Sequence, residues 1–92
     1  MNIIVVGCGK VGLNLADQLN KEGNTITIID NDEKELRHAV DFLDVMGIHG
    51  NGAMPQTLRE AGISDADVLI AATNQDEVNM LCCLFAKKEG NC

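Results

Sequence analysis

The chain has no Trp and no Tyr, and only two Phe among its 92 residues. Proteins that bind single-stranded nucleic acid stack bases on aromatic side chains, so this composition excludes such a platform. Basic residues are also scarce, since seven Lys and Arg stand against 14 Asp and Glu and give a formal net charge of −7. This acidity argues against nucleic acid or an anionic membrane as the main partner. Any phosphate group must therefore be held by a local feature of the chain.

The sequence also lacks a long hydrophobic run. No segment approaches the ~20 apolar residues of a membrane span, and the N-terminus lacks the basic start and apolar stretch of a signal peptide. We therefore expect a cytoplasmic protein. With 46% hydrophobic residues the chain can build one modest core, so we expect a single domain over residues 1–92.

Four cysteines, Cys8, Cys82, Cys83 and Cys92, occur without CxxC spacing and without a paired cluster of histidines. This pattern argues against a structural zinc site and against a disulfide framework, and we expect no metal site. Buried, unreactive thiols are the simpler interpretation. The alternative is a redox-sensing thiol, either at Cys82-Cys83 or at Cys8, where a helix N-terminus would lower the pKa.

Apolar runs alternate with segments of helical periodicity along the chain. Four such runs, 2–6, 25–29, 45–49 and 67–72, predict strands that are covered on both faces. Helical crossovers between them give an α/β, Rossmann-like open parallel sheet in the order 3-2-1-4, with helices on both faces. A fifth strand would be expected to follow the last helix, so we expect the chain to be a fragment of a longer protein.

The segments between the strands carry signals for helix starts and ends. Gly23 is expected to end the first helix in the left-handed conformation. Asp32 and Glu35 resemble a capping box at the start of the second helix. Pro55 suits the first turn of a short third helix that ends near Gly62. Helical spacing predicts an apolar face on each longer helix: Val11, Leu15 and Leu19; Leu36, Ala39, Val40 and Leu43; Val78, Leu81, Cys82, Phe85 and Ala86.

The last helix is apolar beyond one face. Met80, Cys83 and Leu84 lie outside the face just described. Contiguous apolar residues on a surface helix indicate a contact with something else. We therefore expect another element or a second subunit to cover this helix.

Three glycines follow the first strand directly, in the run Gly7-Cys8-Gly9-Lys10-Val11-Gly12. In a strand–turn–helix unit the first glycine permits the tight turn, the second lets a pyrophosphate approach the backbone, and the third lets the helix pack closely on the strand. The anion lies at the helix N-terminus, where free N–H groups and the helix dipole stabilise negative charge. The spacing predicts a dinucleotide site, and a purely structural turn is the alternative.

Asp30 ends the second strand, close to the spacing of about 20 residues from the glycine motif that is expected of a ribose-binding acid. Its carboxylate would accept hydrogen bonds from the ribose hydroxyls and would repel a 2′-phosphate. No Arg follows it immediately, so NAD is favoured over NADP. The alternative is a turn or cap residue, beside Asn31 and Asp32.

Polar residues also follow the third and fourth strands, at the sheet edge where open α/β folds bind ligands. Asn51, next to Gly52, is placed to offer its amide to adenine, and Thr73 and Asn74 are placed to contact ribose or phosphate. For each of them, a polar turn that caps the next helix is an equal alternative. The two histidines are expected to be structural or solvent-facing.

The chain resembles, over essentially its whole length, the RCK or KTN (TrkA-N) family of nucleotide-binding domains. The segments that carry the resemblance are 7–12, 29–30, 49–52, 58–63 and, most specifically, 66–79. It implies a Rossmann-like domain that binds NAD(H), or else ATP or ADP, and regulates a Trk-type potassium transporter or channel without catalysing a reaction. It also implies a place at the inner face of the membrane, where the partners are the transporter's membrane subunit and further copies of the chain.

The resemblance also implies a role for each site residue. Phosphates would lie at the three glycines, with Lys10 approaching them, the adenosine ribose would lie at Asp30 and adenine at Asn51. The full set is Gly7, Cys8, Gly9, Lys10, Val11, Gly12, Asp30, Asn31, Asn51, Gly52, Thr73 and Asn74. Many relatives have Asp where Asn51 stands, and the chain lacks the last strands and helix through which family members usually dimerise.

A different function is open to the same fold. The chain could be the cofactor-binding half of an NAD-dependent dehydrogenase. No Lys or His is placed with a partner for proton transfer, and this half alone forms no substrate pocket. The sequence therefore favours a regulatory domain over an enzyme.

Overall fold

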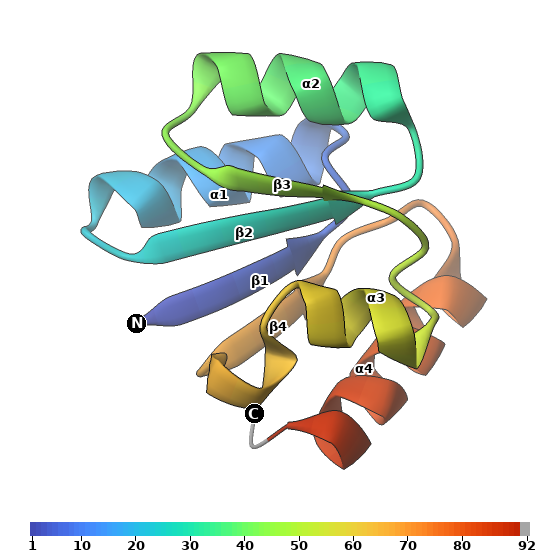
Figure 1. Ribbon diagram of the computed structural model, residues 1–92. Coiled ribbons are helices and arrows are strands. Elements are labelled where there is room, and N and C mark those ends of the chain that lie inside the picture. Colours follow the sequence, from blue (N-terminus) through green and yellow to red (C-terminus); the bar gives the residue numbers. More distant parts are fainter. Residues whose placement is uncertain (91–92) are drawn as a thin grey trace.

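The computed structural model describes residues 1–90, and Cys92 lies outside the described residues. Within them, β1 (Asn2–Val6), β2 (Thr25–Asp30), β3 (Met46–His49) and β4 (Val68–Ala71) form one sheet. All three strand pairings are parallel, and the order is β3-β2-β1-β4 (Figure 1). The predicted fold class and strand order are therefore confirmed.

Helices cover both faces of this sheet (Figure 1). The helices α1 (Lys10–Lys21) and α2 (Glu33–Phe42) pack on one face, and α3 (Pro55–Glu60) and α4 (Asp76–Glu89) pack on the other. A short 3₁₀ helix, η1 (Ile63–Asp65), leads into β4. The chain thus repeats strand and helix in alternation, which brings the carboxyl ends of all four strands to one edge.

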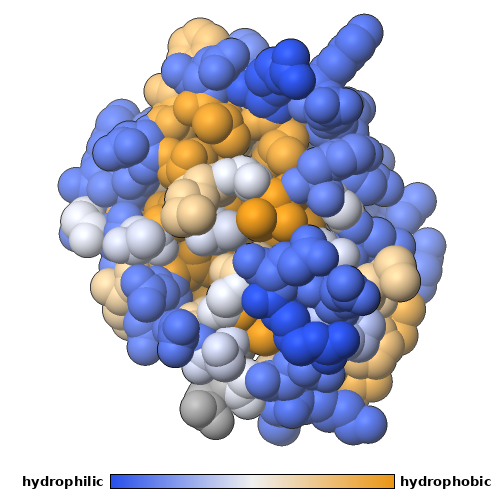
Figure 2. All heavy atoms as spheres, viewed as in Figure 1, coloured by the Kyte–Doolittle hydropathy of each residue, from blue (hydrophilic) through white to orange (hydrophobic). Residues whose placement is uncertain are grey.

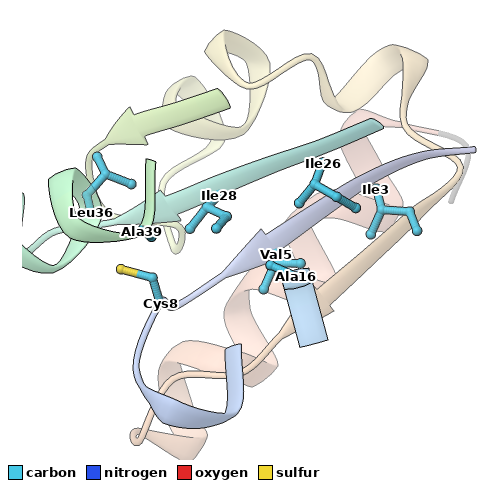
Figure 3. Packing of buried hydrophobic residues seen from close by; sticks show 8 residues of the cluster. All are labelled: Ile3, Val5, Cys8, Ala16, Ile26, Ile28, Leu36 and Ala39. Atoms are coloured by element: carbon cyan, nitrogen blue, oxygen red, sulfur yellow. The ribbon is translucent and has the colours of Figure 1, made fainter. Parts of the chain in front are cut away.

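The core is divided by the sheet into two clusters. Ile3 and Val5 of β1 face α1 and α2 (Figure 3), whereas Ile4 and Val6 face α3 and α4. All four side chains are at most 4% exposed. This two-sided burial explains why the strand reads as a continuous apolar run rather than an alternating one.

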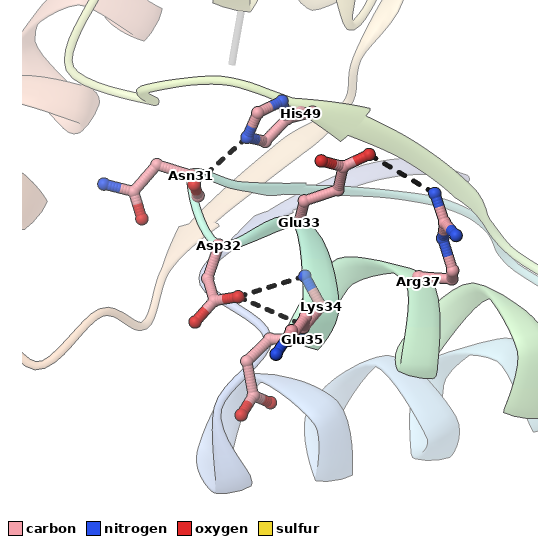
Figure 4. Close-up of polar contacts among 7 residues, drawn as sticks. All are labelled: Asn31, Asp32, Glu33, Lys34, Glu35, Arg37 and His49. Carbon is pink, nitrogen blue, oxygen red and sulfur yellow. Dashed lines mark hydrogen bonds and ion pairs between the residues drawn. The ribbon is translucent and has the colours of Figure 1, made fainter.

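The sequence signals for helix ends are confirmed, with one correction. Gly23 has φ 90° after α1, Pro55 begins α3, and Gly62 has φ 84° after α3. Asp32 caps α2, since its Oδ1 accepts the N–H groups of Lys34 at 3.0 Å and Glu35 at 3.3 Å (Figure 4). A capping box would also have the Glu35 side chain accept the N–H of Asp32. That half of the prediction is wrong, because the Asp32 N–H donates to the carboxylate of Asp30 at 2.7 Å.

The predicted apolar faces are buried only in part. Leu36, Ala39, Cys82 and Ala86 are buried, but Val11, Val40 and Leu81 are exposed. Val11 lies on the first turn of α1, and Val40 lies over Gly47 of the edge strand β3. Apolar residues are visible beside α2 and β3 in Figure 2, within a mainly hydrophilic surface.

The outer side of α4 carries the exposed residues Met80, Leu81 and Leu84. Met80 is 73% exposed, so this helix is apolar beyond its packed face, as predicted.

None of the helices within residues 1–90 combines the length with the apolar character that a membrane span requires.

Gly12, on the first turn of α1, packs against the backbone of Gly7. A Cβ at this position would lie 1.9 Å from the carbonyl oxygen of Gly7, so the helix could not keep its place. We expect Gly12→Ala to destabilise the chain by about 1–3 kcal/mol or more, which outweighs the roughly 0.5–1 kcal/mol that Ala gains over Gly in a helix. Urea unfolding measures the change.

The matched control is Gly9→Ala, because a Cβ at Gly9 meets no atom within 4 Å. The backbone there has φ −69°, which any residue adopts. We expect this variant to unfold at nearly the wild-type urea concentration. Equal midpoints for the two variants would contradict the packing role of Gly12.

Candidate functional site

A cavity of about 660 Å³ opens at the carboxyl ends of the strands. Its volume lies within the range of roughly 300–1,000 Å³ that is usual for small-molecule sites. All predicted site residues except Cys8 and Gly12 line it. The other lining residues are Val6, Ile29, Asp32, Glu35, Gly50, Ala72, Gln75 and Val78.

The three glycines of the loop occupy three different environments. Gly7 has φ 103° and packs so closely on the end of β4 that a Cβ would lie 2.8 Å from the carbonyl oxygen of Ala72. Gly9 lines the cavity and has open space where a Cβ would be. Gly12 lies beneath the loop, against Gly7. Gly7 thus forms the turn, Gly9 leaves space for a ligand to approach the backbone, and Gly12 makes a close packing contact.

The glycine loop also directs the N-terminus of α1 toward the cavity. Gly9 is the N-cap and supplies no side chain to bind the first N–H groups of the helix. Those N–H groups have no acceptor within an α-helix, and together with the helix dipole they attract an anion. Lys10 and Val11, the first helical residues, line the cavity.

Asp30 connects the glycine loop to the start of α2. Its Oδ2 accepts the N–H of Cys8 at 2.8 Å, and its Oδ1 accepts the N–H of Asp32 at 2.7 Å. The turn interpretation of Asp30 therefore describes part of its role. The ribose interpretation stays open, because a carboxylate has about four acceptor positions and this one lines the cavity.

Cys8 lies in the core rather than in the cavity. Its side chain lies with the buried residues of one core cluster (Figure 3), and the residue is 1% exposed. Its thiol donates to Asp30 Oδ2 at 3.3 Å. Burial, with the hydrogen bond and the charge of Asp30, raises the pKa of Cys8 from 9.0 to about 12. Burial likewise raises the pKa of Cys82 to about 11. The alternative of a redox thiol at Cys8 with a lowered pKa is therefore wrong.

The residues after β3 and β4 shape their own loops. Asn51 Oδ1 accepts the N–H of Ala53 at 2.9 Å. The Thr73 hydroxyl donates to Asn79 Oδ1 at 2.6 Å and accepts the N–H of Gln75 at 3.2 Å. Asn51 and Thr73 thus have the turn roles weighed in the sequence, and their contacts to a ligand stay predictions.

Both histidines have structural surroundings. The Nε2–H of His49 donates to the carbonyl oxygen of Asn31 at 3.1 Å (Figure 4), and the ring of His38 packs on Phe42 with centroids 4.7 Å apart. Neither residue lines the cavity. Both histidines are exposed, which agrees with the prediction that they are structural or solvent-facing.

Charge is distributed unevenly around the cavity. Among its described lining residues Lys10 is the one cation, and it follows the glycine loop. Asp30, Asp32 and Glu35 lie together at the end of β2 and the start of α2. The start of α1 beside Lys10 therefore suits phosphate, and the three carboxylates suit groups that donate hydrogen bonds, such as hydroxyls.

Sequence reasoning missed Glu35, Gln75 and Val78 as lining residues. Each lies at or just before the first turn of α2 or α4. In a parallel α/β sheet these helix starts face the same edge as the strand ends. The position of these residues at helix starts could therefore have identified them from the sequence.

The raised pKa of Cys8 predicts a pH dependence of stability. The folded-state pKa of about 12 lies above the ordinary 9.0, so the stabilisation is fully present below pH 9 and is lost as the pH rises toward 12. We expect Cys8→Ala to lose less unfolding free energy than wild type between pH 8 and pH 11, measured by urea unfolding. Equally steep losses in the two chains would argue against the raised pKa.

Comparisons with known proteins agree with this geometry. The family model that describes the TrkA-N domain matches residues 3–92. The chain is 49% identical over 86 residues to the Trk system potassium uptake protein TrkA of Halomonas elongata, covering 94% of this chain and 19% of that protein. It is 43% identical over 88 residues to the TrkA homolog of Methanothermobacter thermautotrophicus, covering 96% of this chain and 41% of that one. The chain thus spans only part of these relatives.

Solved structures show the same fold at low sequence identity. The TrkA-N domain of the inner membrane protein ybaL from Escherichia coli superposes with a TM-score of 0.87 at 19% identity, covering 97% of this chain and 65% of that one. The NAD(P)-binding domain of an exopolyphosphatase-related protein from Archaeoglobus fulgidus has a TM-score of 0.81 at 15% identity, covering 94% and 64%. Because the family model matches residues 3–92 of the 92 in this chain, the chain belongs to the TrkA-N domain family.

Proposed function

We propose that this domain binds NAD(H), with ATP or ADP as alternative ligands, and that its occupancy regulates a Trk-type potassium uptake system. One observation carries the proposal: the open N-terminus of α1 and the carboxylate of Asp30 line one cavity at the carboxyl edge of the sheet. A pyrophosphate needs the first and a ribose needs the second. The relatives named above are potassium uptake proteins, which supports the regulatory part.

The cavity suggests how the ligand would lie. The phosphates would accept hydrogen bonds from the first N–H groups of α1, with Lys10 beside them. The ribose hydroxyls would donate to Asp30, and the amide of Asn51 would face adenine. Asp32 adds a second carboxylate near Asp30, so a 2′-phosphate would meet two negative charges and NAD(H) would be preferred over NADP(H).

The partner of the domain would be the membrane subunit of a potassium transporter, and the domain would act at the cytoplasmic face of the membrane as part of that assembly. Further copies of the chain would complete it, and the exposed Met80, Leu81 and Leu84 on α4 support such a contact. The nucleotide can regulate transport only if its affinity differs between two arrangements of this assembly.

The dehydrogenase alternative has less support. No His is among the described residues that line the cavity, and Lys10 is the one cation among them. Lys10 is also the cation placed to neutralise phosphate. A regulatory domain that performs no catalysis therefore accounts better for this site.

Gly9→Ala tests the placement of the phosphates. A Cβ at Gly9 would enter the open space of the cavity without touching the protein, so it should block the ligand and spare the fold. In titration calorimetry with NAD⁺, NADH, NADPH, ATP and ADP, we expect the best wild-type ligand to bind this variant at least about tenfold less tightly, equivalent to about 1.4 kcal/mol.

Asn14→Ala is the control for that experiment, since Asn14 is an exposed residue of α1 outside the cavity. It should bind like wild type. Unchanged affinity in Gly9→Ala would show that the phosphates lie elsewhere, and hydride transfer from NADH to any added small substrate would contradict the regulatory role.

Asp30→Asn tests the ribose contact. The change removes the negative charge and keeps one acceptor oxygen for the backbone, so we expect NAD⁺ binding to weaken by about 1–3 kcal/mol. The preference for NAD⁺ over NADP⁺ should fall as well. The same calorimetry gives both quantities.

Asp41→Asn makes the same chemical change at an exposed position near the end of α2, outside the cavity. It should leave both quantities unchanged. If Asp30→Asn binds NAD⁺ as wild type does, Asp30 is a turn residue only, and its bonds to Cys8 and Asp32 are its whole role.

A further inference from the structure

Asn79 lies outside the cavity, yet its side-chain amide holds a residue of the cavity wall. Its Oδ1 accepts both the N–H of Thr73 at 3.0 Å and the Thr73 hydroxyl at 2.6 Å. Its Nδ2 donates to the carbonyl oxygen of Thr73 at 3.1 Å. One side chain on the first turn of α4 therefore binds every polar group of Thr73.

These contacts fix the chain just beyond the end of β4. Ala72 is the last residue tied to the sheet, since its N–H donates to the carbonyl oxygen of Val6 at 2.8 Å. Thr73 is the next residue, and Asn79 supplies both a donor and an acceptor to its backbone, as a neighbouring strand would. Thr73, which lines the cavity, is therefore held by α4 instead of by the sheet.

The same piece of backbone supports the glycine loop. A Cβ on Gly7 would lie 2.8 Å from the carbonyl oxygen of Ala72 and 3.1 Å from the nitrogen of Thr73. The loop is therefore pressed directly against the Ala72–Thr73 peptide. A shift of Thr73 would remove the surface on which Gly7 turns, and Gly7 sets the direction in which the loop and the start of α1 face the cavity.

We propose that Asn79 is a positioning residue for the phosphate end of the site: it holds Thr73, and through Thr73 the wall against which the glycine loop turns. This inference rests on the proposed nucleotide function. A purely structural role would lower stability alone, whereas a positioning role changes the loop and the affinity of the folded chain.

The test compares Asn79→Ala with Ala86→Gly. Ala86 is buried on the same helix, away from the cavity, and its change to Gly lowers helix stability by a different route. Both variants are studied below their unfolding transitions, with ADP and NAD⁺ affinities from calorimetry and the backbone amide resonances of the ligand-free chain from NMR.

We expect Asn79→Ala to bind at least about fivefold less tightly and to shift the amide resonances of Gly7 and Gly9. Ala86→Gly should bind within about twofold of wild type, with those resonances unmoved. Asn79→Ser, whose shorter side chain cannot make all three contacts, is the second variant and should behave like Asn79→Ala.

Wild-type affinity in folded Asn79→Ala, with unmoved loop resonances, would overturn the positioning role and leave the proposed function standing. A wild-type chain that binds neither ADP nor NAD⁺ would overturn both. Failure of both Asn79 variants to fold would show that Asn79 is a structural residue and would likewise overturn this inference.

Discussion

The contact between Gly12 and the carbonyl oxygen of Gly7 is the constraint on which the site depends. Because Gly12 has no side chain, α1 can begin directly against the end of β1. Gly7 then turns the chain with φ 103° and lies on the Ala72–Thr73 peptide. Two contacts at backbone distance thus place the helix N-terminus over the carboxyl edge of the sheet. A larger residue at either position would move the helix, and the cavity would lose one of its walls.

This geometry explains how a chain with a net charge of −7 can hold an anion. The helix dipole contributes roughly 0.3–1 kcal/mol at an exposed terminus, and hydrogen bonds to a charged group contribute about 1.5–3 kcal/mol each. Several N–H groups directed at one phosphate therefore outweigh the repulsion of distant, screened carboxylates. Asp30, Asp32 and Glu35 also line the cavity, and Asp30 accepts the N–H of Cys8 in the glycine loop. Their carboxylates would bind hydroxyls rather than phosphates.

The fold was predictable because its signals are local or repeated. The apolar run of β1 indicates burial on two faces, and the alternation of strand and helix leaves few sheet orders. The competition among several possible partners for one polar group was not predictable. Glu35 matches a capping box in sequence, but Asp30 takes the Asp32 N–H first through a tighter local turn. The alternative of a lowered Cys8 pKa is excluded because burial and the neighbouring Asp30 outweigh the helix dipole, which agrees with the simpler interpretation of Cys8 as a buried thiol.

The site residues divide in the same way. The glycine spacing and Asp30 could be read from the sequence, because a motif fixes their places relative to one strand and one helix. Asn79 could not, since its role depends on where α4 starts relative to β4. That helix has a place in both halves of the proposed function. Val78 lines the cavity and Asn79 holds its wall, while Met80 and Leu84 are exposed on the outer side. An α-helix moves as a rigid body, so any shift of the wall that accompanies ligand binding would also move that outer surface. The proposed nucleotide site and the proposed subunit contact would thus share one helix, and that arrangement would couple occupancy to assembly.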